Sequence, residues 1–143
     1  FSDMKFIPFY LVFGLFVFLQ SCGNKQVEEN KLLREKVISI HDEVMPKMGQ
    51  LKSFEKAALQ KASEMNGLDD PDLEKIDSLK NLAVQLNQAY EGMFIWMRQY
   101  KNEDGDQTPE EVKVYLEEQM ILVTQVNEEI KEALANANRL LGS

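Results

Sequence analysis

Apolar residues recur every three or four positions along three long stretches of this chain, and that spacing restricts the stretches to helices. It predicts helices over about residues 28–65, 71–100 and 109–141. The two-residue alternation typical of half-buried strands occurs nowhere in the sequence. With 44% apolar residues and few glycines and prolines, the chain has the composition of one all-α globular domain.

Two polar breaks, at residues 66–70 and 102–107, separate the predicted helices. In the first break, Gly67 is expected to take the left-handed conformation that ends many helices. Asp70 precedes a proline, which predicts an N-cap followed by proline at the first helical position. In the second break, Thr108 stands three residues before a glutamate, the spacing of a capping box.

Connections this short make successive helices antiparallel neighbours, so the predicted fold is an elongated antiparallel three-helix bundle. Helices of roughly 30 residues are about 45 Å long. Pro46 lies inside the first apolar pattern. Its missing N–H and its ring predict a kink there. The alternative is a bundle of four helices, with the first stretch divided at Pro46.

The first 21 residues differ in character from the rest of the chain. Lys5 is followed by an uncharged, strongly apolar run at residues 6–19. A positive residue before an apolar run of this length is typical of a secretory signal peptide. The run leads into the tetrapeptide Leu19–Cys22 (LQSC), and Cys22 is the only cysteine in the chain. An exported protein that used cysteine for disulfides would need an even number.

The tetrapeptide Leu19–Cys22 resembles the lipobox of bacterial lipoprotein precursors. The resemblance implies cleavage after residue 21 and lipid attachment at Cys22. Residues 1–21 are then the signal peptide, residues 22–29 a lipidated polar tether and residues 30–143 the helical domain. We therefore expect an exported protein anchored in the bacterial cell envelope, at the outer membrane in preference to the inner one. Several acyl chains hold such an anchor stably, whereas one alone does so marginally.

The negative net charge of the chain limits the classes of molecule that it can bind. The formal net charge is −8 and the pI about 4.7, so no nucleic-acid partner is expected, because phosphate binding needs a basic face. The sequence has no glycine-rich phosphate loop, paired cysteines or GxSxG elbow. His41 is its only histidine. We therefore expect a non-enzymatic protein with a structural or protein-binding role.

Two segments suggest a different activity. Residues His41, Met45 and Met48 fall at i, i+4 and i+7 and share one helix face. In an antiparallel pair, this face can meet residues 93–97 of the second helix. Thioethers favour soft ions such as Cu(I) and Ag(I), and an indole face attracts a cation. The candidate ligands are His41, Met45, Met48, Met93, Trp96 and Met97. The alternative is that these methionines only fill the core beside a kink.

Residues 93–97 raise a second question, because five consecutive apolar residues cover every side of a helix. Either the second helix is enclosed by the other two, or Phe94 or Trp96 forms a surface patch. An exposed aromatic patch would mark a contact with another envelope protein.

The chain resembles a group of small Bacteroidota lipoproteins that often carry the label viral A-type inclusion protein. The resembling segments are Leu19–Cys22, His41–Gly49, Trp96–Arg98 and Tyr115–Gln119. The resemblance implies an envelope lipoprotein with no assigned activity. The label reflects helical heptads shared by many proteins, so no viral function is carried over.

Overall fold

The computed structural model describes the backbone of residues 7–142 and the side chains of residues 24–142. The expected leader (residues 1–21) and the acceptor Cys22 therefore lie outside the residues whose side chains are described. The helices are α1 (Ile7–Val44), the single 3-10 turn η2 (Met45–Lys47), α2 (Met48–Asn66), α3 (Leu73–Gln99) and α4 (Pro109–Leu141). No strand occurs in the described part of the chain, and the all-α prediction is confirmed.

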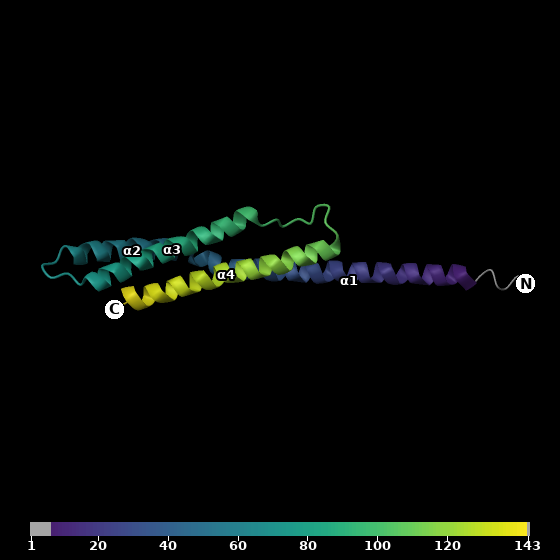
Figure 1. The fold of residues 1–143 in the computed structure, drawn as a ribbon, viewed down its shortest axis with the longest axis horizontal. Helices are drawn as coiled ribbons and strands as arrows, with labels where there is room; N and C mark the ends of the chain where they lie inside the picture. The colour runs from purple at the N-terminus through teal and green to yellow at the C-terminus, as the bar shows by residue number, and fades with distance from the viewer. Residues whose placement is uncertain (1–6, 143) are drawn as a thin grey trace, which may run out of the picture.

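The helices form an elongated bundle of three rods (Figure 1). One rod is the joined run of α1, η2 and α2, and α3 and α4 are the others. The helix α3 runs back along α2, and α4 then runs in the same direction as α1. Two contacts fix this parallel pairing, because Asn30 reaches the carbonyl of Pro109 and Asn127 reaches that of Ile40. The predicted three-helix bundle is confirmed.

The predicted kink at Pro46 is confirmed as the turn η2, which separates α1 from α2. Proline cannot donate the backbone hydrogen bond that would continue α1, and its ring crowds the preceding turn. The three-helix bundle and its alternative with the first helix divided at Pro46 therefore describe the same arrangement. The first rod consists of two helices, α1 and α2, joined by the turn at Pro46.

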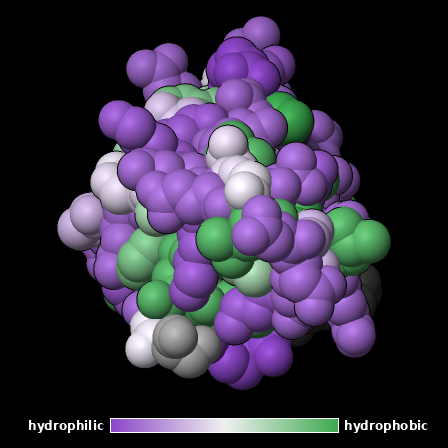
Figure 2. Space-filling model, turned by 90° about the vertical axis from the view of Figure 1, so that its left-hand side faces the viewer, coloured by the Kyte–Doolittle hydropathy of each residue, from purple (hydrophilic) through white to green (hydrophobic). Residues whose placement is uncertain are grey.

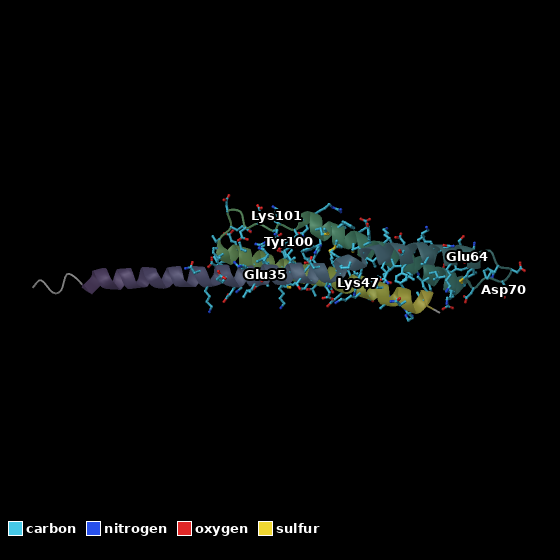
Figure 3. All side chains as sticks on the ribbon, turned by 180° about the vertical axis from the view of Figure 1, so that it is seen from behind. Glu35, Lys47, Glu64, Asp70, Tyr100 and Lys101 are labelled. Atoms are coloured by element: carbon cyan, nitrogen blue, oxygen red, sulfur yellow. The ribbon has the colours of Figure 1, made fainter. Side chains whose placement is uncertain are left out.

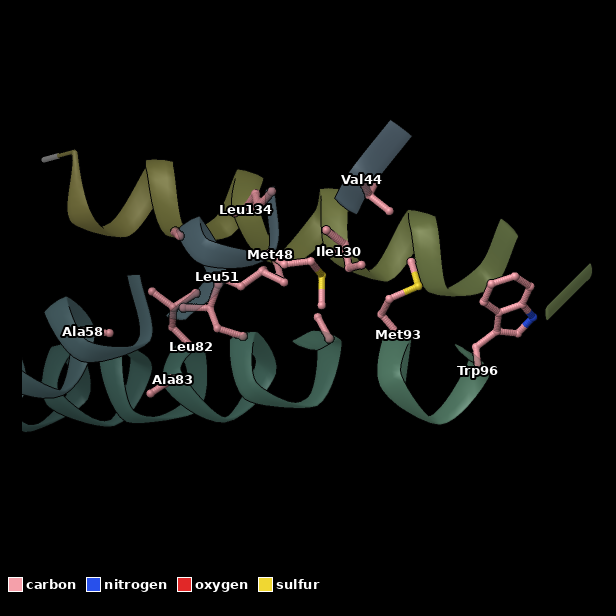
Figure 4. Packing of buried hydrophobic residues seen from close by; sticks show 14 of the residues in the cluster. Val44, Met48, Leu51, Ala58, Leu82, Ala83, Met93, Trp96, Ile130 and Leu134 are labelled. Carbon is pink, nitrogen blue, oxygen red and sulfur yellow. The ribbon is translucent and has the colours of Figure 1, made fainter. Parts of the chain in front are cut away.

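A single apolar core runs along most of the bundle and joins residues from all three rods. Figure 4 shows its middle part, where Leu51, Met93 and Ile130 point into the space between the helices. Fully burying one such side chain contributes about 1.5–3 kcal/mol. A smaller cluster of Ala62, Ile76 and Leu79 closes the end at which α2 meets α3.

Figure 2 views the bundle from that end, where hydrophilic side chains cover most of the surface and hydrophobic ones form separate patches.

Two helix caps predicted for the α2–α3 connection are wrong. Asp72, not Asp70, caps α3, since its carboxylate accepts from the N–H of Lys75 at 3.1 Å. Helix α3 begins only after this second aspartate, so the proline at position 71 stays in the connection.

Gly67 does not take the left-handed conformation, because its φ is −83°. The α2–α3 connection leaves α2 through a right-handed turn, so the left-handed cap is not needed. Among the described residues only Gly105, in the α3–α4 loop, has a positive φ, of 58°. At the end of that loop the Thr108 cap is confirmed, because its hydroxyl accepts from the N–H of Glu111 at 3.2 Å.

The expected start of the first helix near residue 28 is wrong, since α1 already includes the polar segment 22–29. Nothing between residues 24 and 29 breaks a helix, and side chains one turn apart pair there. The amide of Gln26 donates to Asn30 at 2.8 Å, and Lys25 lies 3.9 Å from Glu29. Among residues 24–142, no helix has both the length and the apolarity needed to cross a membrane.

Candidate functional site

The two segments singled out in the sequence meet where α1 passes the last two turns of α3. Arg34 of α1 donates to the hydroxyl of Tyr100 at 3.5 Å, and the ring of His41 lies 5.6 Å from that of Trp96. Because the chain advances along α1 while it retreats along α3, these two contacts fix an antiparallel register. Figure 3 shows Tyr100 beside the stretch of α1 that carries Glu35.

His41 and Trp96 each contact a further residue in addition to one another. The His41 side chain is 17% exposed, and its Nδ1 lies 2.8 Å from the carboxylate of Asp42. Trp96 is only 4% exposed, and its indole N–H donates to Gln119 of α4 at 3.0 Å. The two rings are tilted by 38°. The structure therefore brings these two side chains into contact, and both are largely shielded from solvent.

Trp96 belongs to a row of rings that crosses the bundle. It stacks on Tyr100 with centroids 4.7 Å apart, and Tyr100 lies 6.3 Å from Tyr115 of α4. Burial raises the pKa of Tyr100, and the neighbouring Arg34 acts in the opposite direction. The row extends from His41 on α1 to α4 and fills the space between the helices at this end with large flat side chains.

The candidate methionines are divided between two places. Met93 is fully buried, Met45 is half-buried against the same core, and Met97 is 38% exposed. Figure 4 places Met48 beside Leu51 and Ile130, further along the bundle than Met93 and Trp96. The structure therefore does not bring Met48 to the indole, because the residue lies in α2 beyond the Pro46 turn.

Of the six candidate ligands, only His41 of α1 and Trp96 of α3 are in described contact across these helices, and we call their contact the α1–α3 seam.

The assignment of Trp96 to a surface patch is wrong, because its indole is enclosed by α1 and α4. Phe94 is half-buried, with its ring 4.9 Å from that of Tyr90. The exposed members of this apolar run are Ile95, at 58%, and Met97. Any partner that contacts this part of α3 therefore meets these two aliphatic side chains instead of the indole.

The sequence interpretation missed the buried polar side chains that join α4 to its neighbours. Gln119 is 2% exposed and accepts from both Trp96 and Gln99. Asn127 is buried as well and donates to the carbonyl of Ile40 at 2.9 Å. A signal existed in the sequence, because Gln119 stands three positions after Leu116 and four before Val123, at the helical spacing of an inward residue.

A second missed feature is a surface hollow of about 430 Å³ between α1 and the α3–α4 loop. Its walls include Asn30, Arg34 and Asp104. Arg34 pairs with Asp104 and also donates to the carbonyl of Lys101, so it ties the loop to α1. Among the described residues, no three His, Cys, Asp or Glu side chains come together as a metal site would require.

Comparison of the chain with protein-family models, with curated proteins and with solved structures gives no match.

Proposed function

We propose that this chain is a non-enzymatic lipoprotein of the bacterial envelope, whose helical bundle has a structural or protein-binding role at a membrane surface. The observation that carries the proposal is the uncharged apolar run at residues 6–19, which follows Lys5 and leads into Leu19–Cys22. Acyl groups on Cys22 would supply the membrane attachment that an acidic chain cannot obtain from anionic lipid heads.

The course of α1 supports this proposal, since the helix continues out of the bundle on the side of residue 22 (Figure 1). The first described hydrogen bond from α1 to another helix is that of Asn30 with the carbonyl of Pro109. Cys22 precedes Asn30 by eight positions, or about 12 Å of helix. An anchor at Cys22 would hold the α3–α4 loop close to the membrane and the α2–α3 turn far from it.

The setting of His41 supports a non-enzymatic role. This only histidine of the chain packs on Trp96 and lies against Asp42. The buried polar side chains Gln119 and Asn127 are likewise engaged in contacts between helices. Each of these groups has a structural partner that accounts for its position.

Metabolic labelling with a clickable fatty acid tests the anchor in a bacterium that processes lipoproteins. We expect the full chain to take up label and to migrate as the shortened, mature form. The Cys22→Ser variant should remain unlabelled at precursor size, because it lacks the sulfur that accepts the lipid. Ser21→Ala is the matched control and should label like the wild type, since that position tolerates small residues. Equal labelling of the Cys22→Ser variant would overturn the proposal.

A further inference from the structure

We propose that the outward face of the first half of α4 is a docking surface for a basic amphipathic helix of another envelope protein. We call this surface the α4 acidic face, and its residues are Glu110, Glu111, Val114, Glu117, Glu118 and Ile121. The inference rests on the protein-binding role proposed above and specifies the chemistry of the partner. It starts from two aliphatic side chains on this face, since Val114 is 64% exposed and Ile121 69%.

The positions of these two side chains on α4 direct them away from the core. Val114 stands two positions before the buried Leu116, and Ile121 two before the buried Val123. Two positions correspond to about 200° around a helix, so both side chains lie opposite the core. They are seven positions apart and therefore share one side of α4. A helix of another molecule can contact both at once, because its own apolar residues recur at the same spacing.

Glutamates surround this apolar row. The positions one turn before and one turn after Val114 are all glutamates, namely Glu110, Glu111, Glu117 and Glu118. Residues 109–132 carry seven glutamates and two lysines, a net charge of −5 out of −8 for the whole chain. Among the residues that the structure describes, only Glu117 of these four has an ion pair, an exposed one with Lys113 at 3.8 Å. Lysine or arginine side chains of a partner would complement the other carboxylates.

Stabilisation of α4 itself accounts for only part of this charge. Glu110 and Glu111 lie in the first turn, where carboxylates interact favourably with the helix dipole. Glu117 and Glu118 lie seven positions further on, beyond the reach of that effect. The same charge disfavours two other occupants. Anionic lipid heads would be repelled, and two copies that met through this face would oppose their glutamates.

An open hollow beside Val114 gives a partner side chain a place to enter. Its volume is about 460 Å³, and its lining includes Val114, Tyr115, Glu110 and Glu118. Tyr115 is half-buried, and its hydroxyl accepts from the N–H of Lys101 at 2.8 Å, which holds the ring in place. An aliphatic side chain of the partner would fill the hollow, and a basic residue beside it would reach the glutamates.

Surface plasmon resonance with an immobilised peptide tests the surface. The probe is a synthetic amphipathic helix of leucine and lysine, and its counterpart with glutamate in place of lysine is the control. The full chain carrying Cys22→Ser passes over both in a non-ionic detergent, and detergent alone supplies the blank. We expect binding to the lysine peptide only, weakening as the salt concentration rises. Because this chain has no lipid at residue 22, a negative result would leave the proposed anchor untouched.

A charge-matched pair of variants separates this face from the general acidity of the chain. Glu117→Lys combined with Glu118→Lys should weaken binding of the lysine peptide more than about tenfold, because it reverses the charge that meets the partner. Glu64→Lys combined with Asp69→Lys makes the same change in net charge at exposed positions near the α2–α3 turn. This control should bind within about threefold of the parent chain, since distant charges are screened. Equal weakening by both pairs would overturn the inference.

A second pair of variants tests the apolar row. Ile121→Gln should weaken binding more than about threefold, because it removes an aliphatic contact and leaves the charge unchanged. Leu73→Gln is the matched control and should bind like the parent chain, since Leu73 is 65% exposed but begins α3. Failure of the parent chain to bind the lysine peptide would contradict the inference. So would a dimer, seen by analytical ultracentrifugation, that Ile121→Gln dissociates, because the occupant would then be a second copy.

Discussion

Gln119 occupies a position in α4 that the helical pattern reserves for an apolar side chain. It lies between Leu116 and Val123 on the inward face, yet its amide oxygen accepts from the indole of Trp96 and from Gln99. A buried amide is tolerated when its hydrogen-bonding groups are satisfied. This arrangement fixes how far α4 slides along α3, because only one register brings the three side chains together.

The free energy of unfolding should therefore depend on this amide. Gln119→Leu preserves the apolar volume but leaves the Trp96 N–H buried without an acceptor, and such a loss costs about 1–3 kcal/mol. Urea unfolding followed by circular dichroism measures the effect. Gln125→Leu, at an exposed position of the same helix, is the matched control and should change stability by less than about 0.5 kcal/mol. Equal stability of the two variants would show that the buried amide does not hold the helices.

Residue-level prediction from the sequence succeeded where a single apolar residue stood among polar ones and failed where several adjoined. The buried positions of Leu86 and Ile130, each between two polar neighbours, follow from spacing alone. In the run 93–97 the spacing is equally compatible with Trp96 or Met97 inside. The indole takes the buried position because Gln119 of α4 offers a hydrogen-bond acceptor there. A local sequence pattern cannot show such a partner on another helix.

At the scale of elements, the sequence located every helix but not every end. The start of α4 was predictable because Thr108, a proline and a glutamate follow one another in the required order. The start of α3 was not, since Asp70 and Asp72 are both plausible caps on either side of Pro71. Leu73 begins α3 but is 65% exposed, so the apolar pattern could not decide between them.

Substitution of the two aspartates separates the cap from its neighbour. Asp72→Ala should lower the free energy of unfolding by about 1 kcal/mol, because the N–H of Lys75 loses its acceptor. Asp70→Ala removes an exposed carboxylate in the connection and should stay within about 0.5 kcal/mol of the wild type. Thermal and urea unfolding of both variants measure the difference. A larger loss for Asp70→Ala would contradict the observed cap.

The pairing of α1 with α4 includes contacts that the apolar spacing of a single helix cannot predict. Besides Asn127, an ion pair between Glu43 of α1 and Lys131 of α4 joins these parallel helices. The hydrogen bond from Lys131 lowers the pKa of Glu43. Both residues stand on outward positions of their own helices, and charged residues there are usually solvated. Only the relative placement of the two helices shows that they meet.

At the scale of the whole molecule, the three-rod architecture followed from the spacing of apolar residues and the shortness of two connections. The parallel pairing of α1 with α4 is a consequence of that topology, since the first and third helices of an antiparallel bundle run the same way. The seam between α1 and α3 required the structure, because its residues are about 50 positions apart in the chain and meet only through the register.

The same architecture gives the proposed anchor a defined geometry. From Cys22, the first rod runs through α1, across the Pro46 turn and along α2 to Asn66. These 45 residues correspond to roughly 65 Å of helix at about 1.5 Å per residue. A lipid-anchored chain would therefore hold the α2–α3 turn far from the membrane and keep the α1–α3 seam nearer to it.

The most direct test is mass spectrometry of the amino-terminal peptide, taken from the protein in the bacterial membrane fraction. We predict that this peptide begins at residue 22 and carries a diacylglyceryl group on the Cys22 sulfur, with a further acyl group on its new amine. Each group adds a mass that fragmentation assigns to that residue. A peptide that extends upstream of residue 22, or one with an unmodified thiol, would contradict the account.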